Sequence, residues 1–509
     1  MPRRRLSSTG VAALGVVAGT LLFAACSGST VPQAEGTRGV LPDGHVRSGN
    51  EQVVQDSQAV PLHLGAPRGS TGVVASGGHA APYNYAPTVL QTGGAYRMWW
   101  CSQLPGAPRP GDQILTAGSV SENGPFTAAG GAPAQQVFGN SATGFDRLHT
   151  CDPSVIEVKG VYYLYYTGTS DQAGNHNAIG LATSTDGVHW ARADGGAPIV
   201  SASGDVRRPN AYGAGQPSAL YLNGWFYLMF TDTTGAAADA DGAGQFVLRS
   251  PDPAFQQNVE ALGQDGFVPV TSATGRRTRS VNDSTTSDWM WVDALQSFAI
   301  ASDGTAGTTI TFWDADFTRH PYQQVVIGGP QREGPGLVRG PDGHAPVSTA
   351  DPCGELRLDV IRATGGGGQP NGLRHFGVDV TDLRACRQRA IALTLLSGFA
   401  VPAPDRTVDL VVGDQLVEVE RRSVALSLAV GMLDDPPAFV ATLPVVAHLK
   451  AGVPAMAAPG RPVGLALDGK LWVVGGATVA QLNSSAVRTV SDRQWDAYPR
   501  GADLSGLRP

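Results

Sequence analysis

The sequence predicts an all-β protein, a five-bladed β-propeller followed by a small C-terminal α+β module. Glycine and proline account for 66 and 36 of the 509 residues, which favours many short strands and turns over long helices. A strand–turn–strand pattern recurs along most of the chain as far as about residue 385. Beyond about residue 390 the composition becomes rich in Val, Leu and Ala, which indicates a separate module.

Each repeat is a run of apolar residues, a glycine turn and a second apolar run. Pro87, Pro153 and Pro217 stand second in the first run of three copies, at intervals of 66 and 64 residues. Runs of β-branched and aromatic residues separated by Gly turns are typical of strand meanders. Because proline cannot donate to a ladder, we expect it at a strand start. The predicted first strands therefore begin at Ala86, Asp152 and Gln216, and in weaker copies near Asp288 and near Glu333.

Five such meanders arranged radially would cover one another's faces and leave only short edges exposed. This arrangement is a β-propeller, and the alternative is a β-sandwich built from the same meanders. The predicted domains are the propeller at 66–388 and the accessory module at 389–509, which ends in a β-hairpin segment.

The first 26 residues have the features of an export signal. Arg3 to Arg5 precede the apolar segment 11–23, and a small-residue segment ends at Cys26. This pattern resembles a bacterial lipoprotein signal, which implies lipidation of Cys26; a plain secretory signal is the alternative. Residues 27–65 are predicted to form a flexible tether. We therefore expect a lipid-anchored protein at the outer face of the bacterial cytoplasmic membrane.

Four cysteines remain after Cys26. No spacing among them resembles a zinc site, and an even number in an oxidising compartment favours two disulfides. In the predicted topology the end of the second strand of blade one lies near the start of blade two, which pairs Cys101 with Cys151. Cys353 is then expected to pair with Cys386.

Charge and composition exclude several classes of protein. The net charge is -7 and no Lys/Arg run follows Arg5, so nucleic acid is not an expected partner. With 42% hydrophobic and 16% charged residues, the chain is neither disordered nor a polytopic membrane protein. We expect a monomer that needs no cofactor, no metal site is predicted, and a structural cation in the central channel is left open.

Two segments carry a resemblance to a known family. DPSVIEVKGVYYLYYTG, from Asp152, and IGLATSTDGVHW, from Ile179, resemble the blades of five-bladed propeller glycoside hydrolases. These form the β-furanosidase superfamily, which includes glycoside hydrolase family 43. The resemblance covers residues 70–385 and implies a carbohydrate substrate, with hydrolysis of furanosides or xylosides as the activity. Because propellers of this kind also bind glycans without cutting them, the alternative is a non-catalytic glycan-binding or envelope-scaffolding lipoprotein.

Glycosidic cleavage requires one protonated and one ionised carboxyl group. The leading pair is Asp152, which opens the second meander, and Glu333, in an EGP sequence similar to the one that carries the acid in family 43. Asp112 and Asp288 are further candidates. Non-catalytic readings are a turn cap for Asp152, because it precedes a proline, and a solvated loop carboxylate for Glu333.

The sequence departs from the family at two positions. Family 43 enzymes resemble one another in a base Asp at the start of blade one and an acid Glu at the start of blade three, where this chain has Ala86 and Gln216. The catalytic roles are therefore rearranged, or the protein binds sugar without cutting it. Aromatic, amide and histidine side chains at the same face are expected to bind the sugar: Asn84, Tyr85, His149, Gln216, Trp289 and His344.

Overall fold

The computed structural model describes residues 58–104, 112–365, 372–403 and 408–507. The export signal, the lipidation site Cys26 and most of the predicted tether 27–65 lie outside these residues. Within the described part of the chain, no helix is both long and apolar enough to cross a lipid bilayer.

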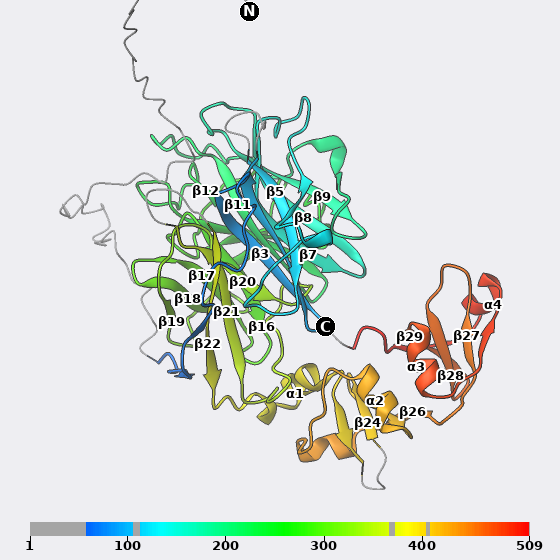
Figure 1. Cartoon of the computed structure of the whole chain (residues 1–509). Helices are drawn as coiled ribbons and strands as arrows, with labels where there is room; N and C mark the ends of the chain where they lie inside the picture. Colours follow the sequence, from blue (N-terminus) through cyan, green and yellow to red (C-terminus); the bar gives the residue numbers. More distant parts are fainter. Residues whose placement is uncertain (1–57, 105–111, 366–371, 404–407, 508–509) are drawn as a thin grey trace, which may run out of the picture.

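Strands are the predominant regular structure of the described residues, as the all-β prediction requires, and they form several sheets (Figure 1). The residues up to 381 form five antiparallel meanders, which we call units one to five. Unit one contains β3 (Asn84–Thr92), β4 (Ala95–Gln103), β5 (Asp112–Ser119) and β6 (Gln135–Phe138). Unit two contains β7 (His149–Val158), β8 (Val161–Thr169), β9 (Ala178–Ser184) and β10 (Ala191–Arg192). Unit three contains β11 (Ala214–Leu222), β12 (Trp225–Asp232), β13 (Gln245–Ser250), β14 (Glu260–Gly263) and β15 (Gly266–Pro269). Unit four contains β16 (Ser287–Val292), β17 (Ser297–Gly304), β18 (Gly307–Asp314) and β19 (Val325–Gly328). Unit five contains β20 (Gly336–Arg339), β21 (Leu356–Ala363) and β22 (Leu373–Thr381), joined by the N-terminal strands β1 (His63–Leu64) and β2 (Arg68–Gly69).

The first two strands of units one to three are joined by two-residue turns of left-handed backbone. The turns are Gly93-Gly94, Lys159-Gly160 and Asn223-Gly224, and all six residues have positive φ. Two successive residues of this kind match the twist of the flanking strands and make tight hairpins. The glycine turns predicted from the sequence are therefore present.

Neighbouring units contact one another in a closed ring. The first strands touch in the order β3, β7, β11, β16, β20 and again β3. Each neighbouring pair of units encloses its own hydrophobic cluster. Large aromatic residues fill these clusters, such as Trp99 between units one and two and Trp289 between units three and four. Burial of such side chains is the main stabilising contribution at each junction.

The ring closes through segments that are distant in the sequence. β20 pairs in parallel with β3, with Val338 opposite Val89. The strands β1 and β2 pair with β22, the edge strand of unit five. Arg68 of β2 forms ion pairs with Asp359 of β21 and, at 2.5 Å, with Asp379 of β22. The N-terminal strands are thus tied to the last unit.

The first strands of units one to three begin two or three residues earlier than predicted. The repeated proline lies inside the strand, and the pairing register shifts at that point in β3, β7 and β11. A β-bulge leaves a residue out of the ladder, so a proline without an N–H is tolerated there. β16 and β20 begin within three residues of the predicted positions.

A short loop after β20 contacts the C-terminal ends of three first strands, β7, β11 and β16. The carbonyl groups of residues 341, 342 and 343 accept hydrogen bonds from the backbone N–H groups of Glu157, Tyr221 and Trp291 at 2.7, 2.8 and 3.1 Å. These three residues belong to units two, three and four. One loop therefore fixes the ends of three units relative to one another.

Both predicted disulfides form. Cys101 is bonded to Cys151 and Cys353 to Cys386, each with 5.3 Å between Cα atoms. The first disulfide joins units one and two, and the second joins unit five to the residues that lead into the C-terminal region.

The C-terminal residues form two small sheets with short helices, beside the ring in Figure 1 and joined to it through α1 (Arg389–Leu396). The first sheet contains β23 (Ala400–Pro402), β24 (Val408–Val412), β25 (Gln415–Val419) and β26 (Val445–Leu449), with α2 (Arg422–Leu428). The second contains β27 (Ala455–Ala457), β28 (Val463–Leu467), β29 (Lys470–Gly475), β30 (Val487–Thr489) and β31 (Arg500–Asp503), with α3 (Ala477–Leu482) and α4 (Asp492–Asp496). β27, β28, α3 and β31 each begin 55 residues after β23, β24, α2 and β26. This constant spacing indicates a duplicated unit whose two copies share one hydrophobic core.

Candidate active site

Five residues, one from each unit, meet at one small pocket at or just before the first strands. Ala86, Asp152 and Gln216 precede the repeated prolines, and their φ angles are 45°, 48° and 51°. Gly334, with φ of 63°, occupies the same position before a proline in unit five, and Asp288 comes from unit four. Left-handed backbone is uncommon in residues other than glycine and is concentrated at functional sites. All five residues line the pocket.

The pocket is narrow because units one and five approach closely. A Cβ atom on Gly334 would lie 2.6 Å from the Cα of Ala86, and one on Gly336 would lie 2.0 Å from the carbonyl oxygen of Pro87. Glycine is therefore required at both positions of unit five. The volume of about 30 Å³ suits one or two water molecules, so a sugar ring would have to lie over the opening.

Asp152 and Glu333, the predicted catalytic pair, both line this pocket. The phenol of Tyr83 donates a hydrogen bond to Glu333 Oε2 at 3.0 Å, and that of Tyr212 donates to Asp152 Oδ2 at 3.4 Å. Burial and then the charge of Asp152 raise the pKa of Glu333 to about 8. Burial also raises the pKa of Asp152 to about 6, against the hydrogen bonds from Thr167 and Tyr212. At neutral pH the first carboxyl is mainly protonated and the second mainly ionised.

Asp112 belongs to the same electrostatic cluster. Burial raises its pKa to about 7, and the charge of Asp152 contributes in the same direction. Tyr85 donates a hydrogen bond to Asp112 Oδ2 at 2.8 Å. His149 Nδ1 lies 3.6 Å from the same oxygen, and burial lowers the pKa of His149 to about 4. The imidazole is therefore neutral at pH 7.

Asp303, at the end of β17, is a carboxylate of this cluster that sequence reasoning missed. Its negative charge contributes to the raised pKa of Glu333, and the nearby backbone N–H of Gly334 lowers the pKa of Asp303 itself. The residue as a whole is exposed, and desolvation by the surrounding protein raises the pKa of its carboxyl to about 7, against the nearby charge of Arg362. A signal was available, because Asp303 stands at the end of a second strand and Asp112 at the start of a third strand, so both flank the connection between second and third strands.

Asp288 lines the pocket but is committed to structural contacts. Its Oδ1 lies 3.3 Å from Nη1 of the buried Arg339 and accepts a hydrogen bond from Ser218 at 2.5 Å. Its Oδ2 accepts from the backbone N–H of Leu337 at 2.7 Å. These contacts join units three, four and five, and they oppose a role for Asp288 in proton transfer.

Three predicted sugar-binding residues do not face the pocket, and these predictions are wrong. Trp289 is fully buried between units three and four. Asn84 is also fully buried, and its Oδ1 accepts hydrogen bonds from Trp100 and the Gly77 N–H, both at 2.8 Å. His344 lies in the loop at the opposite end of the first strands.

Of the other predicted sugar-binding residues, Gln216 has the best position. It lines the pocket, and its buried Oε1 finds no hydrogen-bond partner within the described part of the chain. Tyr85 and His149 are buried beneath the carboxyls, so they support Asp112. Binding of sugar by Gln216 stays a prediction.

Two groups of potential metal ligands include Asp112 or Asp152 of the carboxyl cluster. They are Cys101–Asp112–Cys151 and His149–Cys151–Asp152. Because both cysteines are bonded to each other, neither group retains three available ligands. Neither of these two groups of described residues therefore provides a metal site.

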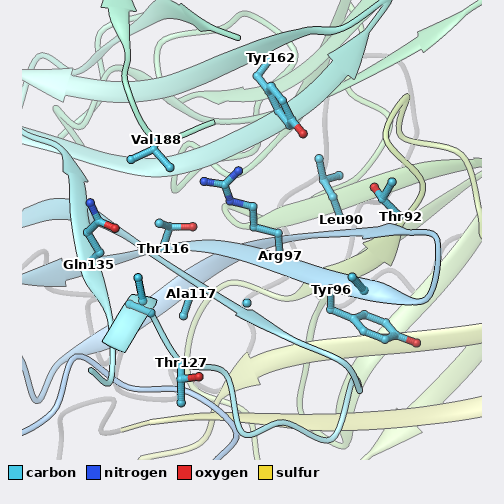
Figure 2. A pocket seen from close by; sticks show the side chains of 14 residues that line it. Leu90, Thr92, Tyr96, Arg97, Thr116, Ala117, Thr127, Gln135, Tyr162 and Val188 are labelled. Carbon is cyan, nitrogen blue, oxygen red and sulfur yellow. The ribbon is translucent and has the colours of Figure 1, made fainter. Parts of the chain in front are cut away.

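A larger cavity of about 440 Å³ lies elsewhere, near the turn between β3 and β4 (Figure 2). Arg97 points across it toward Tyr162, and Tyr96 and Gln135 also line it. Its lining contains no Asp or Glu. Because glycoside hydrolysis requires paired carboxyls, the small pocket is the better candidate for chemistry despite its size.

Comparisons with known proteins give only distant similarity. No protein-family model and no curated protein matches the sequence. Among solved structures, the chain is similar to a family 117 glycoside hydrolase of the marine bacterium Zobellia galactanivorans, with 12% identity over 63% of this chain and 92% of that one and a TM-score of 0.41. It is also similar to the α-L-arabinofuranosidase of Podospora anserina, with 12% identity over 63% and 98% and a TM-score of 0.36. A glycosyl hydrolase of Bacteroides ovatus gives 12% identity over 62% and 94% and a TM-score of 0.39. These structural neighbours are glycoside hydrolases, but scores below 0.5 are too low to indicate an activity, which has to be argued from the pocket.

Proposed function

We propose that the protein is a glycoside hydrolase in which Glu333 is the general acid and Asp152 the catalytic carboxylate. One observation carries this proposal: two carboxyls in a single pocket have pKa values of about 8 and about 6. A pair whose environments separate their pKa values around neutrality can supply a proton and a negative charge at the same pH.

The chemistry follows from these protonation states. Glu333 donates its proton to the glycosidic oxygen as the bond to the anomeric carbon breaks. Asp152 either takes a proton from the attacking water or forms a covalent bond to the anomeric carbon, which water then hydrolyses. Tyr83 and Tyr212 hold the two carboxyls in place through the hydrogen bonds described above.

We propose a five-bladed β-propeller as the scaffold. Five meanders, a closed ring of contacts between first strands and five separate hydrophobic clusters support this architecture. The first strands of a propeller converge on its axis, which explains how positions about 65 residues apart come to share one pocket.

We propose neutral furanosides or xylosides as substrates, as the sequence resemblance implies. Among the described residues that line the pocket, none is Lys, Arg or His. A sugar with a carboxylate or phosphate would therefore meet several acidic groups and no cation, which is unfavourable at short range.

We propose that the protein acts as a monomer at the outer face of the bacterial cytoplasmic membrane, anchored through lipidated Cys26. The lipoprotein-like signal supports export. Two disulfides within the described residues agree with an oxidising compartment.

Turnover of aryl α-L-arabinofuranosides and aryl β-D-xylosides tests this proposal. We expect Asp152→Asn and Glu333→Gln to lower kcat by at least about a hundredfold with little change in sugar affinity. Asp171→Asn, in the loop between β8 and β9 and outside the pocket lining, is the matched control. If the wild-type protein binds these glycans but releases no sugar, the hydrolase proposal is wrong.

That outcome would favour the second candidate, a glycan-binding lipoprotein. Ala86 is the observation that supports it, because the pocket position in unit one carries no carboxylate. We would then expect the wild-type protein to bind these glycans, with nearly the same affinity in Asp152→Asn.

A further inference from the structure

We propose that the cavity between units one and two binds an acidic saccharide, a sugar ring that carries a carboxylate. The cavity shares no lining residue with the carboxyl pocket, so the inference goes beyond the proposed hydrolysis and does not depend on it. Three features carry it: the size of the cavity, a cation without a carboxylate partner, and the neutral polar side chains around that cation.

The cavity is large enough for a sugar ring. It lies where β8 of unit two meets β3, β4 and β5 of unit one (Figure 2). Its volume is about 440 Å³, within the range of about 300–1,000 Å³ that is usual for sites of small molecules. The side chains of Leu90, Ala117 and Val188 give part of the lining an apolar surface. A ring that presents both CH groups and hydroxyls suits such a mixed surface.

Arg97, in β4, is the only Lys, Arg or His among the residues that line the cavity. Its half-buried guanidinium donates a hydrogen bond to the backbone carbonyl of Asp186 and lies 4.9 Å from the centroid of the Trp99 ring. The carboxylate of Asp186 is instead bonded within its own turn, with His189 Nδ1 at 2.7 Å. Within the described part of the chain, no carboxylate forms an ion pair with Arg97.

The positive charge of Arg97 is therefore incompletely compensated. Burial lowers the pKa of Arg97, and the nearby Tyr162 and Asp186 offset this effect only in part. A guanidinium has five N–H donors and binds a carboxylate through two parallel hydrogen bonds, which are stronger than those between neutral groups. In Figure 2 the Arg97 side chain extends across the cavity. A bound carboxylate would supply the missing countercharge.

Neutral polar side chains around Arg97 fit the hydroxyls of a sugar. The phenol groups of Tyr96 and Tyr162 and the amide group of Gln135 border the cavity. Phenols and amides both donate and accept hydrogen bonds, as sugar hydroxyls do. These groups favour a saccharide over a simple carboxylate ion, which would use Arg97 alone.

Two acidic residues lie near the cavity but outside its lining. Glu122 is paired with Arg357 at 2.8 Å, and Glu157 lies opposite Tyr162 in the ladder between β7 and β8. Burial, and then these two carboxylates, raise the pKa of Tyr162 and that of Tyr96, the latter to about 12. Both phenols are therefore neutral at pH 7, and the guanidinium is the only charged group in the lining.

Isothermal titration calorimetry of the full-length protein with three probes tests the inference. The probes are methyl α-D-glucuronide, methyl α-D-glucoside and acetate. We expect the glucuronide to bind at least about tenfold more tightly than either of the others, because it alone has both the ring and the carboxylate. Absence of glucuronide binding, or equal affinity for the glucuronide and the glucoside, would overturn the inference. Equal affinity for the glucuronide and acetate would overturn it as well, because the ring would then contribute nothing.

Variants locate the binding. Arg97→Gln should lower the affinity for the glucuronide about tenfold, to that of the glucoside. Tyr162→Phe keeps the ring but loses the hydroxyl and should lower it about threefold. Arg147→Gln is the matched control, because Arg147 is exposed, donates to the Ser170 carbonyl at 3.3 Å and lies outside the lining. Unchanged affinity in Arg97→Gln, or in Tyr162→Phe if Arg97→Gln fails to fold, would overturn the inference.

Asp152→Asn separates the cavity from the carboxyl pocket. We expect this variant to bind the glucuronide as the wild type does, and a loss of binding would place the ligand in the pocket and overturn the inference. Turnover of neutral glycosides by a protein that does not bind the glucuronide would refute the inference alone. Binding of the glucuronide at the cavity without turnover of any glycoside would refute the proposed function alone.

Discussion

Replacing Glu333 by Gln should make the folded protein more stable while lowering kcat by at least about a hundredfold. The carboxyl has an ordinary pKa of 4.5 and a pKa of about 8 in the folded protein. Between these values the unfolded chain has released the proton and the folded protein still binds it. Stability therefore falls as pH rises through this interval, and a neutral amide has no such cost.

The size of the effect follows from the two pKa values. A difference of one in pKa corresponds to about 1.4 kcal/mol. At pH 7 the unfolded group is about 2.5 pH units above its pKa, so retaining the proton costs the fold about 3 kcal/mol. At pH 5 the same calculation gives about 1 kcal/mol.

Urea denaturation of the wild-type protein and Glu333→Gln at pH 5 and pH 7 measures this cost. The variant should be more stable at both values, and its advantage should grow by about 2 kcal/mol between them. Asp171→Asn controls for the loss of a carboxylate elsewhere. A stability difference that is the same at both pH values, or a variant less stable than the wild type at pH 7, would refute the reasoning.

Two further predictions concern contacts away from the pocket. Burial lowers the pKa of His344, but the hydrogen bond to Asp293 and the charges of Asp342 and Asp293 outweigh it and raise this pKa from 6.5 to about 8. His344→Gln should therefore lower the free energy of unfolding by about 2 kcal/mol below pH 6.5, and this loss should disappear as the pH rises through about 8. Denaturation of both proteins at pH 6 and pH 9 measures the difference. The disulfide between Cys101 and Cys151 closes 50 residues of chain, so replacing both cysteines by Ser should lower the free energy of unfolding by about 4 kcal/mol; an equal denaturation midpoint would contradict this expectation.

Much of the pocket could be predicted because the repeat marks it. A residue before a proline at the same place in each copy leads to Asp152, and the EGP sequence leads to Glu333. Asp303 stands at the end of the second strand of unit four and not at the repeated position, so it could be found only by counting strands.

The errors have equally specific causes. Successive side chains of a strand point to opposite faces, so Trp289 had to face the hydrophobic cluster once its neighbour Asp288 faced the pocket. β20 is four residues long, and the loop that follows it therefore lies at the far end of the first strands. His344 belongs to that loop and could not be placed without knowing where β20 ends.

The parallel pairing of β20 with β3 has a consequence for how the chain matures. Val89 and Val338 face each other across about 250 residues of sequence, so the strand made first finds its partner only after nearly all five meanders exist. Until then both open edges offer unpaired N–H and C=O groups to other chains, and pairing over such a separation is slow. The free edges of β3 and β20 are therefore prone to pair with other chains for as long as the ring stays open.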